Sequence, residues 1–220
     1  MSFTAQDVKR LRDMTSAGMM DCKKALTECD GNEEAAVKWL REKGIASAAK
    51  KAGRTAAEGA IHSYIHQGGK YGVLAEINIE TDFAAKSDQF KALCDDICMH
   101  ICSAMPKWVR QADVPQDAID AEKEIFKNKA AQDGKPEQIQ DKIAEGQLKK
   151  WYTKVCLYDQ PFVKDPDKSI ETLLNEATGS IGEKIDVHRF VRYERGEGIE
   201  KVASNLADEV AATVAAAESK

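Results

Sequence analysis

The sequence lacks the long hydrophobic runs that a membrane protein needs. The 220-residue sequence contains no run of about 18 consecutive apolar residues, the length that a membrane-spanning helix needs. No apolar segment typical of a secretion signal follows Met1. We therefore expect a soluble, cytoplasmic chain with no membrane partner. An excess of positive charge is also missing, since 32 Lys and Arg stand against 37 Asp and Glu, a net charge of −5. Surfaces that follow phosphates are usually basic, so we expect no nucleic acid partner.

Motifs of bond-making catalysis are absent as well. No glycine-rich phosphate loop precedes an expected helix, and neither a Ser/His/Asp set nor a zinc-ligand spacing is present. The six cysteines are typical of reduced thiols in a cytosolic protein rather than of a secreted disulfide framework. We therefore expect no catalytic residues, no resident metal and no cofactor.

Three of the cysteines nevertheless recur every four residues, at Cys94, Cys98 and Cys102, with His100 beside them. Aligned thiolates are good ligands for soft metals, so a thiol or metal enzyme is an alternative. No distant Cys/His cluster completes such a site, and side chains two positions apart on a helix do not face each other. Burial as small hydrophobes explains these cysteines better, because they lie along the apolar stripe of Phe90, Leu93, Ile97 and Ile101.

The clearest signal in the sequence is a change of period between Tyr71 and Phe90. Apolar residues alternate over Tyr71–Ile79, which predicts a strand with one covered face, and helical spacing follows over Ser87–Met105. Between them lies Thr81-Asp82-Phe83. We interpret these three residues as an exposed tip of the kind that contacts partners. Alternatively, Thr81 or Asp82 only caps the helix and Phe83 is a buried anchor.

Two further strands are expected, at Gly59–His66 and Lys184–Glu194. The first is joined to Tyr71–Ile79 by a Gly-Gly turn, which is typical of a hairpin, and the other also alternates. We predict an α+β fold in which a three-stranded antiparallel sheet packs with helices. A sheet of this size cannot stand alone, so the Ser87–Met105 helix should cover one face.

Helical units flank this core on both sides. Residues 1–44 predict a module of three short helices, with Thr4 and Asp7 as a cap and Gly44 as the final stop. Met19 and Met20 are adjacent and cannot both face one small core. They are either an adaptable partner surface or one core residue and one idle residue. Residues 45–58 are expected to form a linker, partly helical.

Charged sequence with a narrow apolar seam over residues 115–150 predicts a projecting helical hairpin. It divides the core into residues 59–114 and 151–195. In the second part we expect a loop at Tyr158–Ser169 and a short helix at Thr172–Ala177. Residues 196–220 should form a C-terminal helix, which docks either on a partner or on its own core.

Four strings of the sequence resemble the elongation factor Ts family. GVLAEINIETDFAAKS at 72–87 and TSAGMMDCKKAL at 15–26 are similar to its two signatures. QPFVKDP at 160–166 and RFVRYERGEGIEKV at 189–202 are similar to further family segments. These strings follow one another in the family's order and cover nearly the whole chain.

The resemblance implies a guanine-nucleotide exchange factor of translation elongation. Its partner would be elongation factor Tu, bound in the GDP-bound and nucleotide-free states. By resemblance, Phe83 would insert between partner side chains, Asp82 would disturb the groups that hold Mg²⁺, and Thr81 would hold the tip. The resemblance also implies a ubiquitin-associated (UBA)-like fold for the first 44 residues and a coiled coil for the hairpin.

Secondary contacts are implied in two further places. Resemblance assigns grip on the partner's nucleotide domain to Arg12, Met19, Met20 and Lys23, and contact with a more distant partner domain to His100, Phe162 and Val163. Longer family members carry a second, degenerate copy of the sheet core. This chain has only one copy, so we expect a homodimer. A UBA-type protein-binding module without exchange activity would also fit the two methionines, but it leaves the tip unexplained.

Overall fold

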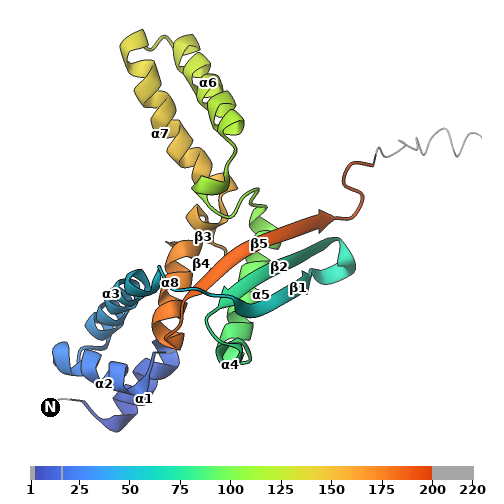
Figure 1. Cartoon of the computed structure of the whole chain (residues 1–220). Coiled ribbons are helices and arrows are strands. Elements are labelled where there is room, and N and C mark those ends of the chain that lie inside the picture. Colours follow the sequence, from blue (N-terminus) through green and yellow to red (C-terminus); the bar gives the residue numbers. More distant parts are fainter. Residues whose placement is uncertain (1–2, 16, 200–220) are drawn as a thin grey trace, which may run out of the picture.

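The computed structural model describes residues 3–15 and 17–199. Around a small three-stranded sheet it arranges a three-helix head, a projecting helical hairpin and a buried helix (Figure 1). The predicted α+β class is confirmed. No helix in these ranges is long and apolar enough to span a membrane. The expected C-terminal helix lies outside the described residues, apart from its first few positions.

The sheet consists of β1 (Glu58–Ile65), β2 (Tyr71–Ile79) and β5 (Ile185–Glu194), in the order β1-β2-β5 and antiparallel throughout. A short 3₁₀ turn, η1 (Gln67–Gly69), joins the first two strands. All three predicted strands are confirmed to within one residue at each end. The alternation in β2 has its expected consequence, because Val73, Ala75, Ile77 and Ile79 are buried.

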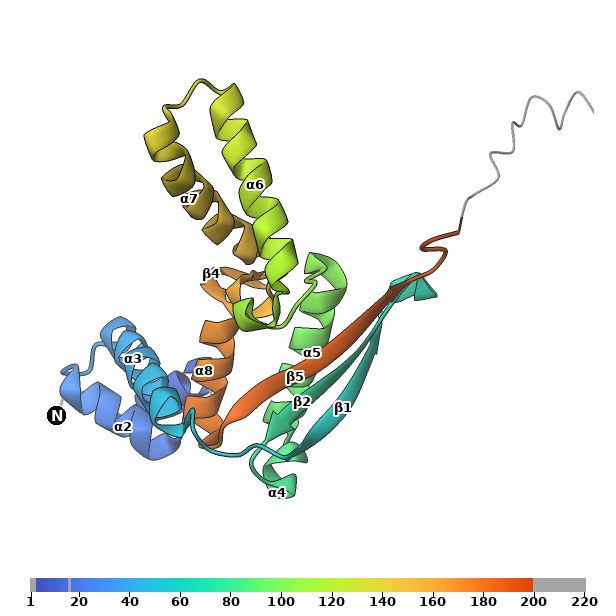
Figure 2. The same cartoon turned by 45° about the horizontal axis from the view of Figure 1, so that its top comes forward.

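One face of the sheet is covered by α5 (Asp88–Ala104), as Figure 2 shows. Ser87 caps this helix by accepting a hydrogen bond from the backbone N–H of Phe90 at 3.2 Å. The predicted stripe of Phe90, Leu93, Ile97 and Ile101 is buried against the strands, together with Cys94, Cys98 and Cys102. Burial of this apolar area is the main force that joins helix and sheet.

The head contains α1 (Ala5–Thr15), α2 (Met19–Glu28) and α3 (Glu33–Lys51) around the small apolar core of Val8, Leu11, Cys22, Ala25, Leu26 and Ala36. The predicted stop at Gly44 is wrong, because α3 continues for seven more residues to Lys51. Gly44 is instead the place where α3 crosses α8: a Cβ on Gly179 would lie 2.7 Å from the Gly44 Cα. Of the expected linker, residues 45–51 belong to α3, residues 52–57 connect it to the sheet, and Glu58 begins β1.

The hairpin consists of α6 (Gln116–Gln132) and α7 (Glu137–Val155), and Figure 1 shows it projecting from the core. The seam between the helices is narrower than predicted, because Ala130 and Ala144 are buried while Ile125 and Ile139 are exposed. Short 3₁₀ turns, η2 (Gln111–Asp113) and η3 (Leu157–Asp159), adjoin its base.

The second part of the core is more regular than expected. Instead of a loop at 158–169, a two-stranded ribbon forms from β3 (Pro161–Phe162) and β4 (Asp165–Ser169). Likewise, α8 (Ile170–Ile181) is twice as long as the predicted helix because Ser169 caps its first turn. Gly182, in the left-handed conformation, ends α8 and leads into β5.

Candidate functional site

The predicted tip lies at the end of the sheet, where β2 leads into the short helix α4 (Asp82–Ala85) (Figure 2). Thr81 is the N-cap of this single turn, and its Oγ1 accepts a hydrogen bond from the Ala84 N–H at 3.2 Å. Ala84 faces the core and is buried. Phe83, its neighbour on the turn, therefore faces outward and is 85% exposed. The alternative of Phe83 as a buried anchor is wrong.

Asp82 is exposed beside Phe83 and carries a fixed negative charge. The Lys86 ammonium donates a hydrogen bond to its carboxylate at 2.7 Å. That bond and the attraction between the two charges lower the pKa of Asp82, so it stays ionised at neutral pH. The tip thus presents an aromatic ring and a carboxylate side by side, on a turn whose own packing uses neither.

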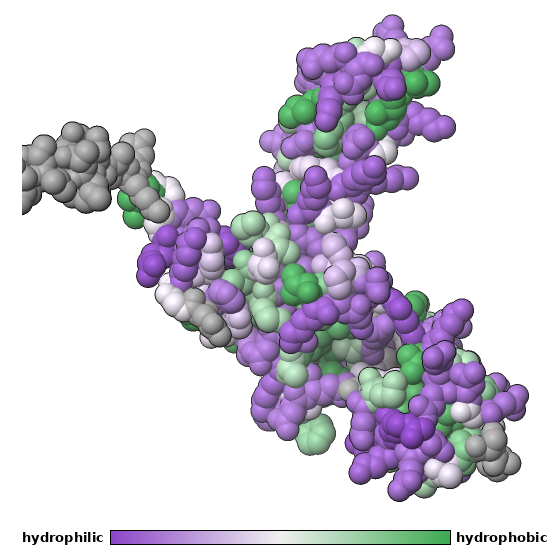
Figure 3. All heavy atoms as spheres, turned by 180° about the vertical axis from the view of Figure 1, so that it is seen from behind, coloured by the Kyte–Doolittle hydropathy of each residue, from purple (hydrophilic) through white to green (hydrophobic). Residues whose placement is uncertain are grey.

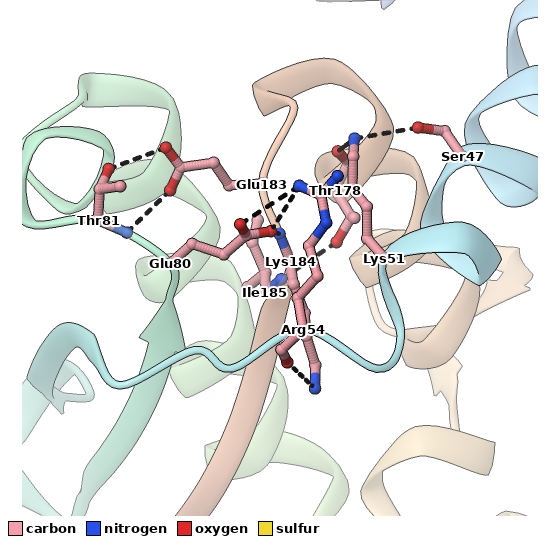
Figure 4. A network of polar contacts seen from close by, with 9 residues as sticks. All are labelled: Ser47, Lys51, Arg54, Glu80, Thr81, Thr178, Glu183, Lys184 and Ile185. Atoms are coloured by element: carbon pink, nitrogen blue, oxygen red, sulfur yellow. Dashed lines mark hydrogen bonds and ion pairs between the residues drawn. The ribbon is translucent and has the colours of Figure 1, made fainter.

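A polar network behind the tip ties it to the turn between α8 and β5 (Figure 4). The Glu183 carboxylate accepts hydrogen bonds from the Thr81 N–H at 3.0 Å and from the Thr81 hydroxyl at 2.8 Å. The adjacent Glu80 accepts from the Lys184 N–H at 2.7 Å and pairs with Arg54 at 3.3 Å. The Lys184 N–H contributes most to lowering the pKa of Glu80. Sequence reasoning missed both glutamates.

On the head, the structure places the four predicted contact residues on the surface. Arg12, Lys23, Met19 and Met20 are all exposed, and the last two are 44% and 73% accessible. The interpretation of one methionine as a core residue is wrong, because Cys22, Ala25 and Leu26 fill the inward positions of α2. Met14 is exposed as well, although its spacing in α1 predicts an inward position.

The third predicted group is mostly internal. His100 and Phe162 are buried, and only Val163 reaches the surface, at 40% exposure. The His100 Nδ1 accepts from the Val163 N–H at 3.4 Å, so its Nε2 carries the proton and donates to Gln160 Oε1 at 3.0 Å. Burial lowers the pKa of His100 and keeps the ring neutral. His100 therefore shapes the loop that displays Val163.

The cysteines of α5 belong to the core rather than to a reactive site. Burial raises the pKa of Cys94 and of Cys98 to about 12. Both side chains are therefore thiols at neutral pH, whereas a nucleophile or a soft-metal ligand needs the thiolate. This chemistry speaks against the thiol or metal enzyme.

Comparison with known proteins assigns the family. A profile of the family described as Elongation factor TS matches residues 5–197. The chain belongs to the elongation factor Ts family. An elongation factor Ts of Geobacter sulfurreducens is 56% identical over 212 residues, which cover 96% of this chain and 98% of the relative. One of Desulforamulus reducens is 55% identical over 214 residues, covering 97% and 99%, and one of Acetivibrio thermocellus is 54% identical over 207 residues, covering 94% and 96%.

As a member of this family, the chain is a guanine-nucleotide exchange factor of translation elongation that acts on elongation factor Tu. It changes which nucleotide the partner holds and makes or breaks no covalent bond, so it is not an enzyme.

Proposed function

We propose that the Thr81-Asp82-Phe83 tip is the wedge that drives GDP release from elongation factor Tu. The observation that carries this proposal is the 85% exposure of Phe83 on a turn whose other side is buried and clasped. A large aromatic ring held in water on a rigid turn costs free energy in the isolated protein. A partner that buries the ring would recover it.

The physical requirement for exchange is differential binding. A G protein holds its nucleotide through backbone N–H groups and through Mg²⁺ bridging to the phosphates. Suppose that an exchange protein binds the nucleotide-free state of its partner more tightly than the GDP-bound state. By linkage, the ratio of these two affinities is also the ratio by which the exchange protein lowers the partner's affinity for GDP. Phe83 would displace partner side chains beside the Mg²⁺ site, and the ionised Asp82 would disturb the groups that hold the ion. GTP then rebinds.

The head and the Val163 loop would supply binding area away from the wedge. Arg12, Met19, Met20 and Lys23 lie exposed on a head that we assign a UBA-like fold. Flexible methionines adapt well to a partner surface. On the other side, Val163 would contact a more distant partner domain, supported from within by His100 and Phe162. We place this activity in the cytoplasm and expect neither nucleic acid nor membrane to take part.

Release of fluorescent GDP from elongation factor Tu tests the wedge. We expect Phe83→Ala to lower the maximal release rate at saturating factor about tenfold or more, because misplaced contacts at a reacting centre cost rates of that order. Asp82→Asn should lower it less. Ile125→Ala removes another exposed apolar side chain, from the hairpin, and serves as the control. Unchanged release by folded Phe83→Ala protein would refute the wedge.

We further propose that two copies pair through the open face of the sheet. The face opposite α5 exposes Ile61, Ile65, Leu74, Val191 and Tyr193. Leu74 lies on the central strand opposite Val191, so the apolar residues are contiguous across the strands. Uncovered apolar faces of this kind are typical of interfaces. In a two-fold symmetric dimer, the same face of each copy would cover the face of the other.

Light scattering measures this directly: the chain should have twice its 24.2 kDa mass, and Leu74→Arg should be monomeric. If one partner molecule meets the tip of one protomer and the Val163 loop of the other, two defective proteins should complement each other. After the subunits of Phe83→Ala and Val163→Asp have exchanged in an equal mixture, about a quarter of normal GDP release should return. About half of the dimers are then heterodimers, and one of the two sites in each heterodimer is intact. A monomeric mass for the unaltered chain, or no recovery on mixing, would contradict the composite site.

A further inference from the structure

The tip poses a structural problem, because a helix of one turn does not hold its own shape. Forming a first turn is unfavourable, and α4 has only four residues. Its exposed residues, Asp82 and Phe83, contribute nothing to holding it, apart from the ion pair between Asp82 and Lys86 on the same turn. A wedge that displaces partner groups must be rigid, so something else has to fix its direction.

Many helices solve this with a capping box. The N-cap hydroxyl accepts from the N3 backbone N–H, and a Glu or Gln at N3 reaches back to the N-cap N–H. In α4 the first half exists, since Thr81 Oγ1 accepts from the N–H of Ala84, which is the N3 residue. The second half cannot form locally, because alanine has no acceptor.

Glu183 supplies the missing half from 102 residues away in the chain. One carboxylate oxygen accepts from the Thr81 N–H at 3.0 Å and the other accepts from the Thr81 hydroxyl at 2.8 Å. Thr81 thus uses its backbone donor, its hydroxyl donor and its hydroxyl acceptor at once. Hydrogen bonds to an ionised carboxylate are roughly twice as strong as neutral ones.

A second clasp of the opposite sense lies one residue earlier. Here the Glu80 side chain accepts from the Lys184 backbone N–H at 2.7 Å, whereas in the first the Glu183 side chain accepts from the Thr81 backbone. Two neighbouring residues at the end of β2 and two at the start of β5 therefore exchange side-chain-to-backbone bonds (Figure 4). The pair of clasps removes the freedom of the tip to rotate about the end of the strand.

We propose that Glu183 is a positioning residue for nucleotide exchange: it completes the cap of α4 from outside and thereby fixes the direction in which Asp82 and Phe83 project. This rests on the proposed wedge function of the tip. Glu183 lies behind the tip, on the turn between α8 and β5, and its carboxylate accepts hydrogen bonds from Thr81. Its contribution is therefore to the rate of the wedge step rather than to the affinity of the encounter.

Glu183→Gln tests the proposal with little change in shape. An amide has one acceptor oxygen, so one of the two Thr81 donors then faces an NH₂ group. We expect the maximal GDP-release rate at saturating factor to fall about tenfold, while the factor concentration at half-saturation changes less than threefold. Glu171→Gln, an exposed glutamate on the first turn of α8, is the matched control and should keep the normal rate.

Hydrogen exchange in the absence of any partner gives an independent readout. Amides over 81–85 should exchange about tenfold faster in Glu183→Gln, and those of α5 should be unchanged, because only the local opening becomes easier. Thr81→Ser keeps all three hydrogen-bonding roles, so the amides over 81–85 should exchange as slowly in this variant as in the unaltered protein. Thr81→Val opens the same clasp from the other side, and combining it with Glu183→Gln should be no worse than the worse single change.

The outcomes separate this inference from the function on which it rests. If Phe83→Ala leaves the rate of GDP release unchanged, the proposed wedge is refuted. If Phe83→Ala lowers this rate and Glu183→Gln or Thr81→Val does not, the wedge is supported and the positioning role of Glu183 is refuted. A loss of rate with unchanged hydrogen exchange at 81–85 would also overturn the positioning role, because Glu183 would then act in another way.

Discussion

The head and the α6–α7 hairpin are both helical units added to one small core, yet they are attached in opposite ways. The head lies along α8 with its last helix, α3, as Figures 1 and 2 show. Gly44 and Gly179 let the two backbones touch. Arg41 pairs with Glu176 at 3.0 Å, and the Lys51 ammonium donates to the Thr178 carbonyl at 3.4 Å.

Within residues 3–15 and 17–199, the hairpin is joined to the rest of the molecule at its base. The Trp108 and Trp151 rings meet there at 5.7 Å, beside the buried Val155 and Cys156. The Gln160 side chain donates to the Lys154 carbonyl at 2.7 Å and thereby ties the last turn of α7 to the core. Beyond this base, the space-filling view shows a separate lobe with a mostly hydrophilic surface (Figure 3).

This difference teaches which parts of the molecule can act together. The helix that holds the head, α8, ends at Gly182, directly before the Glu183 that clasps the tip. The head and the tip therefore share one support, so on the proposed function a partner bound by the head would meet the tip in a fixed geometry. The hairpin reaches this support less directly, through η3 at its base, which contacts both α7 and α8. Changes at the contact between α3 and α8, here called the head joint, should accordingly affect GDP release. Changes in the projecting part of the hairpin should not.

The largest expected effect comes from the glycine crossing. In Gly179→Ala the new Cβ meets the Gly44 backbone at 2.7 Å, which forces α3 away from α8. We expect a loss of about 1–3 kcal/mol in the free energy of unfolding, as for other overpacked contacts. The concentration of factor needed for half-maximal GDP release should also rise. Thermal unfolding and a titration of the release assay measure the two effects.

The other side of the same contact supplies the control. A Cβ on Gly44 would lie 3.9 Å from the Glu176 Cα, which is ordinary van der Waals contact. Gly44→Ala should therefore keep the head docked and stabilise α3 slightly, since alanine is the better helix former. Equal behaviour of the two alanine variants would contradict the crossing as we describe it.

This joint also marks where sequence reasoning ends. Residues 71–79 and 87–105 could be predicted because their periodicity is local, and the exposure of the tip was predicted from its place between a strand and a helix. A glycine near the end of a helical pattern indicates a stop, and nothing local distinguishes Gly44 from one. Its reason is a contact with Gly179, which only the folded chain brings near.

The same limit applies to single polar residues. Glu183 stands beside a glycine in a charged turn, and no local pattern connects it with Thr81. His100 lies among cysteines, and its burial depends on Gln160 and Val163 from another segment. Met14 has the spacing of a core residue, yet the module is too small to bury it. Local pattern thus predicted the elements, whereas long-range contacts decided how they are joined.

Acid should loosen the hairpin joint before the head joint. Burial lowers the pKa of His100 in the folded chain, whereas the unfolded chain has a value of about 6.5. The unfolded state therefore binds more protons below that pH. Stability is fully present above about pH 6.5 and falls as the pH drops below it, by at most about 1.4 kcal/mol per pH unit for one proton.

Hydrogen exchange at pH 7 and pH 5.5 locates this effect. Amides over 105–110 and 154–163 should open more readily at the lower pH, whereas those of α3 and the second half of α8 should change little, apart from the intrinsic effect of pH. His100→Gln keeps a donor and an acceptor without a titrating ring and should remove the difference. The carboxylates with lowered pKa, among them Glu80 and Asp82, lose their contribution only in more acid solution. Equal loosening of both joints would refute the assignment to His100.

The smallest expected effect concerns Gly146, which lies within a helix as Gly44 and Gly179 do, but away from any helix crossing. It therefore gives the sharpest comparison with the glycine crossing. Gly146 lies in the middle of α7, and a Cβ there would meet nothing within 4 Å. Gly146→Ala should stabilise the helix by about 0.5–1 kcal/mol, because alanine loses less backbone entropy on folding. Hydrogen exchange in α6 and α7 should slow accordingly. Since Gly146 lies in the projecting part of the hairpin, away from its base, the rate of GDP release and the half-saturating concentration should both stay unchanged. A changed rate of GDP release in Gly146→Ala would contradict this expectation. It would show that the stability of the hairpin affects the wedge through the contacts at the hairpin base.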